Sequence, residues 1–241
     1  GCNALNNMVD ACVQGVEFIA ANTDIKSLSM CKAPTKIQMG SKLTRGLGAG
    51  ANPEIGRQAA LEDIEKITEH LKGSDMVFIT CGLGGGTGTG ASTVIAEISK
   101  DLGALTVAIA TKPFTFEGKD RMIQAENGVA QLKTRVDSLI TIPNQRLLSI
   151  GGKHMTIMEA FLKADEVLLN AVRSISDLIV GSGHVVVDFA DVKTIMSERG
   201  MAIMGIGESS GENRAREAAQ KAISSPLLED ISIHGARGVL I

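Results

Sequence analysis

A run of glycine and threonine, GLGGGTGTG at 82–90, is the stretch of this 241-residue chain best suited to bind an anion. It holds six glycines and two threonines and follows the apolar segment MVFIT at 76–80. Glycines leave backbone N–H groups uncovered, threonine hydroxyls can donate further hydrogen bonds, and the positive end of a following helix favours negative charge. The run predicts a di- or triphosphate site, with a flexible turn as the simpler alternative. The residues expected around the phosphates are Gly84, Gly85, Gly86, Thr87, Gly88 and Thr89.

Two common phosphate-binding motifs fit the run poorly. Gly86, Gly88 and Ala91 satisfy the GxGxxA pattern of dinucleotide-binding oxidoreductases, which is a weak signal alone. The next strand ends in Thr-Lys at 111–112, without the acid that would hold a ribose hydroxyl. A P-loop needs a lysine after its last glycine, and none follows Gly90. Neither class accounts for the run.

Other polar or glycine-rich residues also stand at the ends of expected strands or the starts of expected helices. The segment GLGAGANP at 46–53 is a second glycine-rich loop before a helix, or simply a turn with a cap. Asn22 and Asp24 follow a strand, where α/β folds bind ligands, although a helix cap explains them equally well. Asp188 and Asp191 begin another helix and face the same way, as a catalytic pair or as an N-cap with a first-turn acid.

These residues need a scaffold, and the chain alternates between strand and helix patterns. We expect strands at 16–20, 36–40, 76–80, 105–111 and 138–142. Asn52 caps a helix that begins at Pro53, with Ala60, Ile64, Ile67 and Leu71 on its buried face. A second helix is expected from about Gly90 to Asp101, with Val94, Ile95 and Ile98 inward. The alternation predicts an α/β fold with a mostly parallel sheet covered by helices on both faces.

Beyond this unit the pattern changes. Apolar residues at three- and four-residue spacing predict a helix over 157–180, about 35 Å long, which is longer than a crossover helix needs. We expect it to connect two units. A loop over 181–188, a short helix from Phe189, a strand over 201–207 and a helix from Glu212 should follow. The predicted organisation is a nucleotide-binding domain over 1–156, a connecting helix over 157–180 and a partial second α/β domain over 181–241.

Composition excludes several classes of protein. The net charge is −3 and aromatic residues make up 2%, so we expect no nucleic-acid partner. The four cysteines are widely spaced without a CxxC, which predicts reduced thiols in a cytoplasmic protein and no structural zinc. No apolar run approaches the roughly 20 residues of a membrane helix, so neither membrane insertion nor a signal peptide is expected.

The glycine run after a buried strand resembles the signature of the tubulin/FtsZ GTPases, and the wider sequence is similar to the FtsZ family of bacterial cell division. Seven blocks occur in the family's order: GVEFIAANTD (15–24), LTRGLGAGANPEIGR (43–57), GLGGGTGTGAS (82–92), KPFTFEG (112–118), DSLITIPN (137–144), DFADVKTIMSE (188–198), and SGENRA with AISSPLLED (210–215, 222–230). The resemblance implies a Rossmann-like GTPase domain that binds GTP or GDP with Mg²⁺. It also implies a cytoplasmic protein of the mid-cell division ring, the Z-ring, that polymerises head-to-tail into filaments.

The resemblance also implies roles for individual residues. Guanine recognition needs acceptors for N1–H and the exocyclic amine and a donor to O6. Asp165 and Asn144 can supply these groups. Phe161 either covers the base or packs in the core. Gly1 and Asn3 match the end of the first phosphate loop. The remaining expected nucleotide contacts are Asn22, Asp24, Gly48, Ala49, Gly50, Glu117 to a ribose hydroxyl and Arg121 to a phosphate, the last two being solvated surface residues in the simpler interpretation.

In this family the catalytic site is split between subunits. Asp188 and Asp191 are expected to enter the pocket of the neighbouring copy and position water and Mg²⁺ for assembly-dependent GTP hydrolysis. Val186 stands where the family has asparagine and Gln145 where it commonly has aspartate. The valine suggests an alternative, an assembly protein that binds nucleotide with weak or no turnover.

The same comparison predicts more chain on both sides. Family members carry a strand before the position of Gly1, central in the sheet. They continue past Ile241 into further strands and a tail that recruits cell-division adaptor proteins. We therefore expect this chain to be a fragment.

Overall fold

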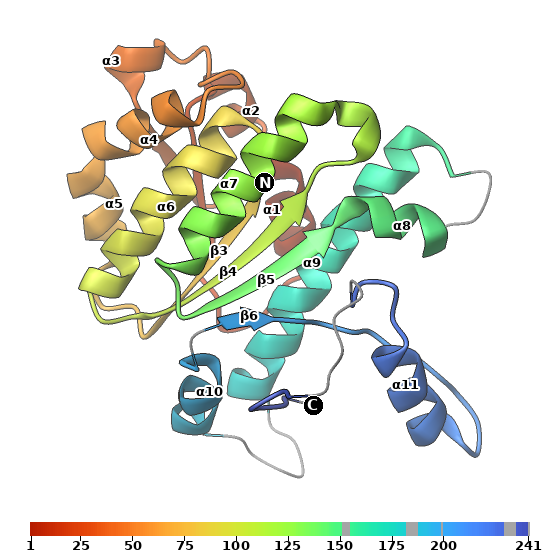
Figure 1. The fold of residues 1–241 in the computed structure, drawn as a ribbon. Helices are drawn as coiled ribbons and strands as arrows, with labels where there is room; N and C mark the ends of the chain where they lie inside the picture. The colour runs from red at the N-terminus through yellow and green to blue at the C-terminus, as the bar shows by residue number, and fades with distance from the viewer. Residues whose placement is uncertain (151–154, 182–187, 199, 229–234, 241) are drawn as a thin grey trace.

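The computed structural model describes residues 1–150, 155–181, 188–198, 200–228 and 235–240 (Figure 1). Its strands are β1 (Ile19–Asn22), β2 (Thr35–Gln38), β3 (Met76–Gly82), β4 (Leu105–Lys112), β5 (Ser138–Pro143) and β6 (Gly200–Ala202). Its helices are α1 (Cys2–Asp10), α2 (Ile25–Ser29), α3 (Ser41–Thr44), α4 (Pro53–Glu62), α5 (Ile64–Leu71), α6 (Gly86–Asp101), η1 (Thr115–Glu117), α7 (Lys119–Lys133), α8 (Asn144–Ile150), α9 (Ile157–Val180), α10 (Phe189–Met196) and α11 (Arg214–Ile223). The predicted α/β class is confirmed.

The described strands form two parallel sheets. One has the order β1-β2 and the other β3-β4-β5-β6, and every pairing is parallel. Helices α4, α5, α6 and α7 cover one face, while α1 and α9 cover the other (Figure 1). A parallel sheet brings the carboxyl ends of its strands to one edge, so the loops after β1, β3, β4 and β5 converge there.

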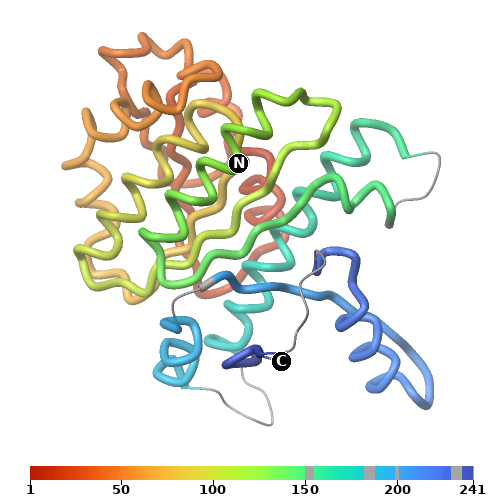
Figure 2. The backbone as a smooth tube through the Cα atoms, in the orientation of Figure 1, coloured from red at the N-terminus to blue at the C-terminus, as the bar shows by residue number. Residues whose placement is uncertain are grey.

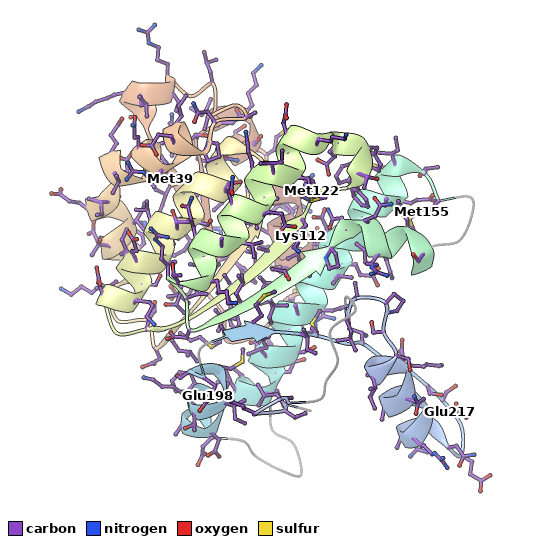
Figure 3. The ribbon with its side chains drawn as sticks, in the orientation of Figure 1. Met39, Lys112, Met122, Met155, Glu198 and Glu217 are labelled. Atoms are coloured by element: carbon purple, nitrogen blue, oxygen red, sulfur yellow. The ribbon has the colours of Figure 1, made fainter. Side chains whose placement is uncertain are left out.

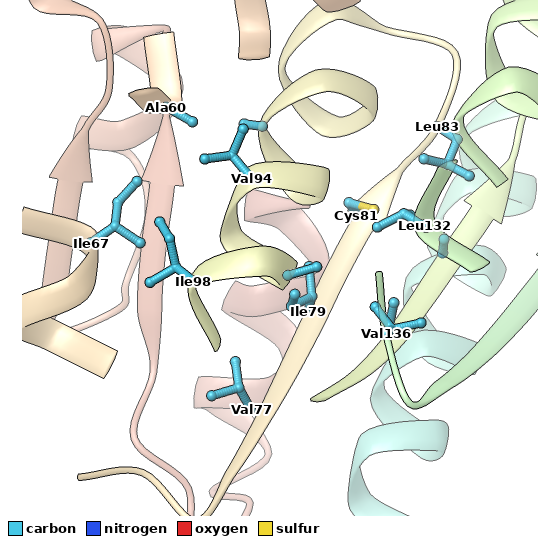
Figure 4. Packing of buried hydrophobic residues seen from close by; sticks show 14 of the residues in the cluster. Ala60, Ile67, Val77, Ile79, Cys81, Leu83, Val94, Ile98, Leu132 and Val136 are labelled. Atoms are coloured by element: carbon cyan, nitrogen blue, oxygen red, sulfur yellow. The ribbon is translucent and has the colours of Figure 1, made fainter. Parts of the chain in front are cut away.

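Apolar side chains of alternating strand positions enter two different cores. In β4, Ala108 and Ala110 join the cluster under α5, α6 and α7, whereas Val107 and Ile109 join the cluster under α1 and α9. Figure 4 shows the first cluster, where Val94 and Ile98 of α6 meet Ile67 of α5 and strand β3. Burial on both faces explains why β4 reads as a continuous apolar run.

A cavity of about 1040 Å³ separates the two sheets. Strand β1 borders it on one side and β3 on the other, and residues of α1, α5, α6 and α9 complete its lining. Gly1, Cys2, Asn22, Gly82 and Thr87 border it where the strands end. The cavity therefore opens among the residues expected to bind the phosphates.

Helix α9 has 24 residues, begins beside α8 and crosses the molecule to the far end of the sheet (Figure 2). Thr156 and Glu159 cap its start reciprocally, with Thr156 Oγ1 accepting the Glu159 N–H at 3.2 Å. Its buried residues include Ala164, Leu168 and Val172, as the spacing predicted. Ile157, also expected on that stripe, is exposed.

Three differences from the sequence prediction concern the helix after Pro53, strand β1 and the segment after α9. The helix expected after Pro53 is two helices, because the buried Asp63 carboxylate accepts the Gly40 N–H at 2.8 Å and contacts the Lys66 ammonium at 2.5 Å. The chain turns there, which leaves Ile64 at 40% exposed instead of buried. Strand β1 lies later than 16–20 because ladder pairing with β2 begins only at Ile19.

The third difference concerns the segment after α9. Strand β6 covers Gly200–Ala202, shorter than the expected 201–207, and pairs with β5 of the four-stranded sheet. Helix α10 begins at Phe189 as predicted, and α11 begins at Arg214, two residues later than expected. In the described part of the chain, no helix combines the length and apolar character needed to cross a membrane.

Candidate nucleotide site at the carboxyl edge of the sheet

Helix α6 begins at Gly86, inside the glycine run, four residues earlier than predicted. Its first turn packs directly on the start of α4, because a Cβ at Gly86 would lie 2.7 Å from the Gly50 carbonyl oxygen and one at Gly90 only 1.8 Å from that of Pro53. Gly56 of α4 makes the reciprocal approach to the Gly86 carbonyl oxygen. Close helix packing, which the sequence analysis did not consider, thus accounts for Gly86 and Gly90.

The earlier glycines of the run lie beside α7. Gly84 has φ +97° and its missing Cβ faces the Arg121 carbonyl oxygen at 2.6 Å, while its N–H donates to Thr89 Oγ1 at 2.8 Å. Gly85 faces more open space, with the Arg121 guanidinium as its nearest neighbour at 3.9 Å. The Thr89 hydroxyl therefore fixes the loop from inside, and Arg121 places a positive charge beside Gly85.

The first turn of α6 offers N–H groups to a ligand. The opening N–H groups of any helix lack acceptors within the helix. That of Gly86 donates to the Gly50 carbonyl at 2.9 Å. Among the described residues, no group outside the helix accepts the N–H of Thr87 or Gly88. These two amides and the positive end of the helix dipole therefore face the carboxyl edge of the sheet, where they can bind an anion.

Thr23 joins the two glycine-rich loops and was missed by the sequence analysis. Its side chain is fully buried, and its Oγ1 accepts the Ala49 N–H at 3.0 Å and lies 2.6 Å from Thr87 Oγ1. Gly48 and Gly50, with φ of +89° and +57°, flank Ala49 in backbone that favours glycine. The sequence signal for Thr23 was its place between Asn22 and Asp24 at the end of a strand. A hydroxyl buried at a strand end seldom lacks a hydrogen-bond partner.

Asn22 and Asp24 are occupied by local contacts. Asp24 caps α2, accepting the Lys26 N–H at 2.9 Å and the Ser27 hydroxyl at 2.8 Å, and these bonds hold the pKa of its carboxyl below the usual value. Asn22 accepts the Asp24 N–H at 3.1 Å and donates to Cys2 Sγ at 3.5 Å. The capping alternative therefore describes Asp24.

Asn144 stands where β5 passes into α8, and its side chain is 5% exposed. Its Oδ1 is buried without any hydrogen-bond partner in the described part of the molecule. A buried acceptor left unpaired costs free energy, so a ligand that supplies a donor here would gain most of that cost back. Gln145, which stands where the family commonly has aspartate, accepts the Thr115 N–H at 3.0 Å and the Thr115 hydroxyl at 2.8 Å.

Asp165 and Phe161 lie one turn apart on α9. Asp165 is half-buried and has no hydrogen-bond or ion-pair partner among the described residues, and burial raises the pKa of its carboxyl. Phe161 is 39% exposed, so it is not a core residue. Its ring meets those of Phe114 and Phe116 edge-on, at centroid distances of 5.2 and 6.2 Å.

Glu117 and Arg121 form an ion pair, with Nη1 and Oε2 2.5 Å apart. Glu117 also accepts the Phe114 N–H at 2.9 Å, which closes the turn after β4. Lys112 ends β4 at the same edge and pairs with Glu126 at 3.3 Å (Figure 3). Two ion pairs thus lie along this rim. Gly1 and Asn3 stand at the start of α1, both exposed.

Asp188 and Asp191 lie elsewhere. Both are exposed, at the N-cap and in the first turn of α10, and the Asp188 carboxylate makes no capping hydrogen bond. They follow the far end of α9, and α9 spans about 36 Å. Figure 3 shows the same separation, with Met155 before α9 and Glu198 after α10 at opposite ends of α9. The structure does not bring these acids to the glycine loops of their own chain. Val186 lies outside the described residues.

Comparison with known proteins agrees with this architecture. Residues 1–152 match the GTPase domain of the tubulin/FtsZ family, and residues 200–241 match the C-terminal domain of the FtsZ family. The chain belongs to the tubulin/FtsZ family. It is 60% identical over its whole length to the cell division protein FtsZ of Azotobacter vinelandii and to that of Pseudomonas aeruginosa. It spans 61% of the length of each.

Solved structures show the same fold. An empty FtsZ dimer from M. jannaschii is 52% identical with a TM-score of 0.92, covering 95% of this chain and 66% of that one. CetZ2 from Haloferax volcanii, solved as a GTPγS-bound protofilament, has a TM-score of 0.79 at 19% identity, covering 93% of this chain and 68% of that one. The second likeness speaks to fold alone.

Proposed function

We propose that this chain binds GTP and GDP at the carboxyl edge of its sheet. The observation that carries the proposal is Asn144, whose buried Oδ1 lacks a partner at the end of β5. Guanine presents N–H donors on the edge that such an acceptor recognises. Asp165 supplies a second acceptor, half-buried and without a partner among the described residues. Phe161, exposed beside it, offers an aromatic face or edge to the base.

The phosphates would lie over the first turn of α6. The Thr87 and Gly88 amides, the helix dipole and the Arg121 guanidinium beside Gly85 supply the positive potential there. The Thr23–Thr87 hydrogen bond brings the loop over Gly48–Gly50 to the same place, where it can meet a terminal phosphate. Glu117, held by Arg121, is the candidate for a ribose hydroxyl.

Mg²⁺ would reach this site on the nucleotide. The described residues include no group of three or more His, Cys, Asp or Glu side chains that could cage a metal. Mg²⁺ commonly binds through substrate phosphates, waters and one or two carboxylates, so this edge fits such a metal. When bound, it would neutralise charge on the phosphates.

We further propose that hydrolysis requires a second copy of the chain. Asp188 and Asp191 are the exposed acids that the family resemblance makes catalytic, and they lie at the opposite end of α9 from Asp165. If copies stack head-to-tail, the acids of one meet the phosphates of the next and can position the attacking water. Such a contact does not close on itself and generates filaments. The FtsZ relative solved as a dimer supports self-association.

We propose that in the cell this activity builds the division ring in the cytoplasm, as the family resemblance implies; the names of the FtsZ relatives state a role in cell division. Binding of adaptor proteins through the tail found in the family stays a prediction.

The test measures GTP binding, sedimentation and phosphate release over a range of protein concentrations. We expect phosphate release per molecule to rise steeply at the concentration where filaments first sediment. Binding and sedimentation with almost no phosphate release would favour the alternative of an assembly protein with weak turnover. A chain that ignores GTP, or that cleaves it equally well when dilute, would overturn the proposal.

A further inference from the structure

Two cysteines of this chain meet beside the candidate nucleotide site. Cys2 lies in the first turn of α1 and is half-buried, and Cys31, 3% exposed, follows α2. Cys31 belongs to a small apolar cluster with Ala20 and Leu28, and Cys2 packs against that cluster. Both are free thiols.

Hydrogen bonds along α1 hold the two segments in register. The Asn6 side chain donates to the Met30 carbonyl at 3.3 Å and accepts the Lys32 N–H at 2.7 Å. It therefore binds the backbone on both sides of Cys31. Lys32 also pairs with Asp10 at 2.6 Å. Cys2, Asn6 and Asp10 recur every four residues, which places them on one helix face. The Cys2 side chain is therefore directed at the segment that carries Cys31.

We propose that Cys2 and Cys31 are a redox-responsive pair that closes to a disulfide and thereby changes the nucleotide site. With glutathione disulfide as oxidant, the Cys2 thiolate attacks one glutathione sulfur and releases the other glutathione as a thiolate. The Cys31 thiolate then attacks the Cys2 sulfur, forming the protein disulfide and releasing the second glutathione. Two protein thiols are oxidised and one glutathione disulfide is reduced to two glutathiones.

The other cysteines lack such a partner among the described residues. Cys12 is exposed, and its Sγ lies 3.8 Å from the Asp10 carbonyl oxygen. Cys81 is buried in β3, and burial raises the pKa of its thiol to about 11. Burial also raises the pKa of the Cys2 thiol, so its exchange should be slow near neutral pH and faster as pH rises.

The link to the nucleotide site runs through Asn22, whose Nδ2 donates to Cys2 Sγ at 3.5 Å. A disulfide moves that sulfur toward Cys31 and frees the Asn22 amide at the end of β1. This consequence rests on the proposed nucleotide binding, whereas formation of the disulfide does not.

The first experiment uses the whole chain carrying Cys12→Ser, equilibrated with glutathione disulfide and glutathione and digested with trypsin. Cleavage after Lys26 and Lys32 should yield peptide 1–26 joined to peptide 27–32, and reduction should separate them. The equilibrium constant against glutathione should be at least about tenfold higher for the folded chain than for the chain in urea. The matched control, Cys12→Ser with Cys31→Ser, should give only a glutathione adduct on Cys2.

If Cys2 and Cys31 stay separate, or pair no better folded than in urea, the proposal is wrong. The second experiment compares GDP affinity of the oxidised and reduced chains, where we expect about tenfold weaker binding after oxidation. A disulfide that leaves GDP affinity unchanged would overturn the link to the nucleotide site. If the reduced chain itself fails to bind GDP, the proposed function fails, and the joined peptide alone decides the redox pair.

Discussion

The hydroxyl oxygens of Thr23 and Thr87 lie 2.6 Å apart and tie the end of β1 to the first turn of α6. Thr23 Oγ1 also accepts the Ala49 N–H, so one buried hydroxyl holds both glycine-rich loops. Replacing it with an apolar side chain of similar shape should leave the Ala49 amide buried and unpaired. We expect Thr23→Val to lower the free energy of unfolding by about 1–3 kcal/mol and to weaken GDP binding.

The control is Thr23→Ser, which keeps the hydroxyl and should retain most of both properties. Urea unfolding and a GDP titration measure the two effects. Equal stability of the valine and serine variants would show that the shared hydrogen bond does not hold the loops.

Two glycines of the run should respond differently to substitution, because Gly90 packs against α4 whereas Gly85 faces the candidate phosphate site. A methyl group at Gly90 would lie 1.8 Å from the Pro53 carbonyl oxygen, so Gly90→Ala should cost about 3 kcal/mol or more of stability. Gly85 has open space and an ordinary φ of −99°, so Gly85→Ala should fold normally and weaken GTP binding by intruding where a phosphate would lie. Thermal unfolding and GTP titration of both variants check this. A Gly85→Ala chain with unchanged affinity would remove that residue from the phosphate site.

We expect replacement of Asn144 to weaken nucleotide binding without lowering the stability of the protein. Because its Oδ1 is buried without a partner, Asn144→Leu removes an unpaired polar group and keeps the number of side-chain heavy atoms. We expect the nucleotide-free variant to be as stable as the parent or more stable by about 1 kcal/mol, with GDP affinity reduced about tenfold or more. Gln145→Ala, which loses only the Thr115 contacts, serves as the control for affinity. Retained GDP affinity in Asn144→Leu would exclude this residue from the guanine site.

Asp165 predicts opposite pH dependences for stability and binding. Since burial raises the pKa of its carboxyl above the unfolded value, the native state holds that proton more tightly. Without nucleotide, its contribution to stability should therefore increase as pH falls through the raised pKa. Guanine binding needs the ionised acceptor, so GDP affinity should fall over the same window, above the ordinary range of an aspartic acid. Asp165→Asn should flatten both dependences, and an unaltered affinity profile would contradict the assignment.

Much of the fold followed from sequence because its signals were strong locally. Doubly buried strands such as β4 read as apolar runs, and α9 kept its spacing over 24 residues. The start of α6 could not be predicted from sequence, because glycines are poor helix formers and only packing on α4 extends the helix through Gly86. The break at Asp63 likewise depends on the distant Gly40 amide.

The candidate site shows the same division. Glycine loops and strand-end polar residues could be found by type and position, but their partners could not. Thr23 gains its importance from Ala49 and Thr87, both distant in sequence. Phe161 fell on the apolar stripe of α9, yet the Phe114 and Phe116 rings hold it at the surface. Contacts of this kind depend on how elements pack, which periodicity does not record.

The central claim is that the nucleotide of one copy meets Asp188 and Asp191 of another. Mixing two inactive variants tests it directly. Asp188→Ala should bind GTP but release no phosphate, and Asn144→Leu should keep its acids but bind GTP poorly. Mixed at concentrations that support assembly, they should recover a measurable fraction of the parent rate, because acids of the second variant can serve GTP held by the first. If phosphate release in the mixture equals the sum of the separate variants while the two co-sediment, the shared site does not exist.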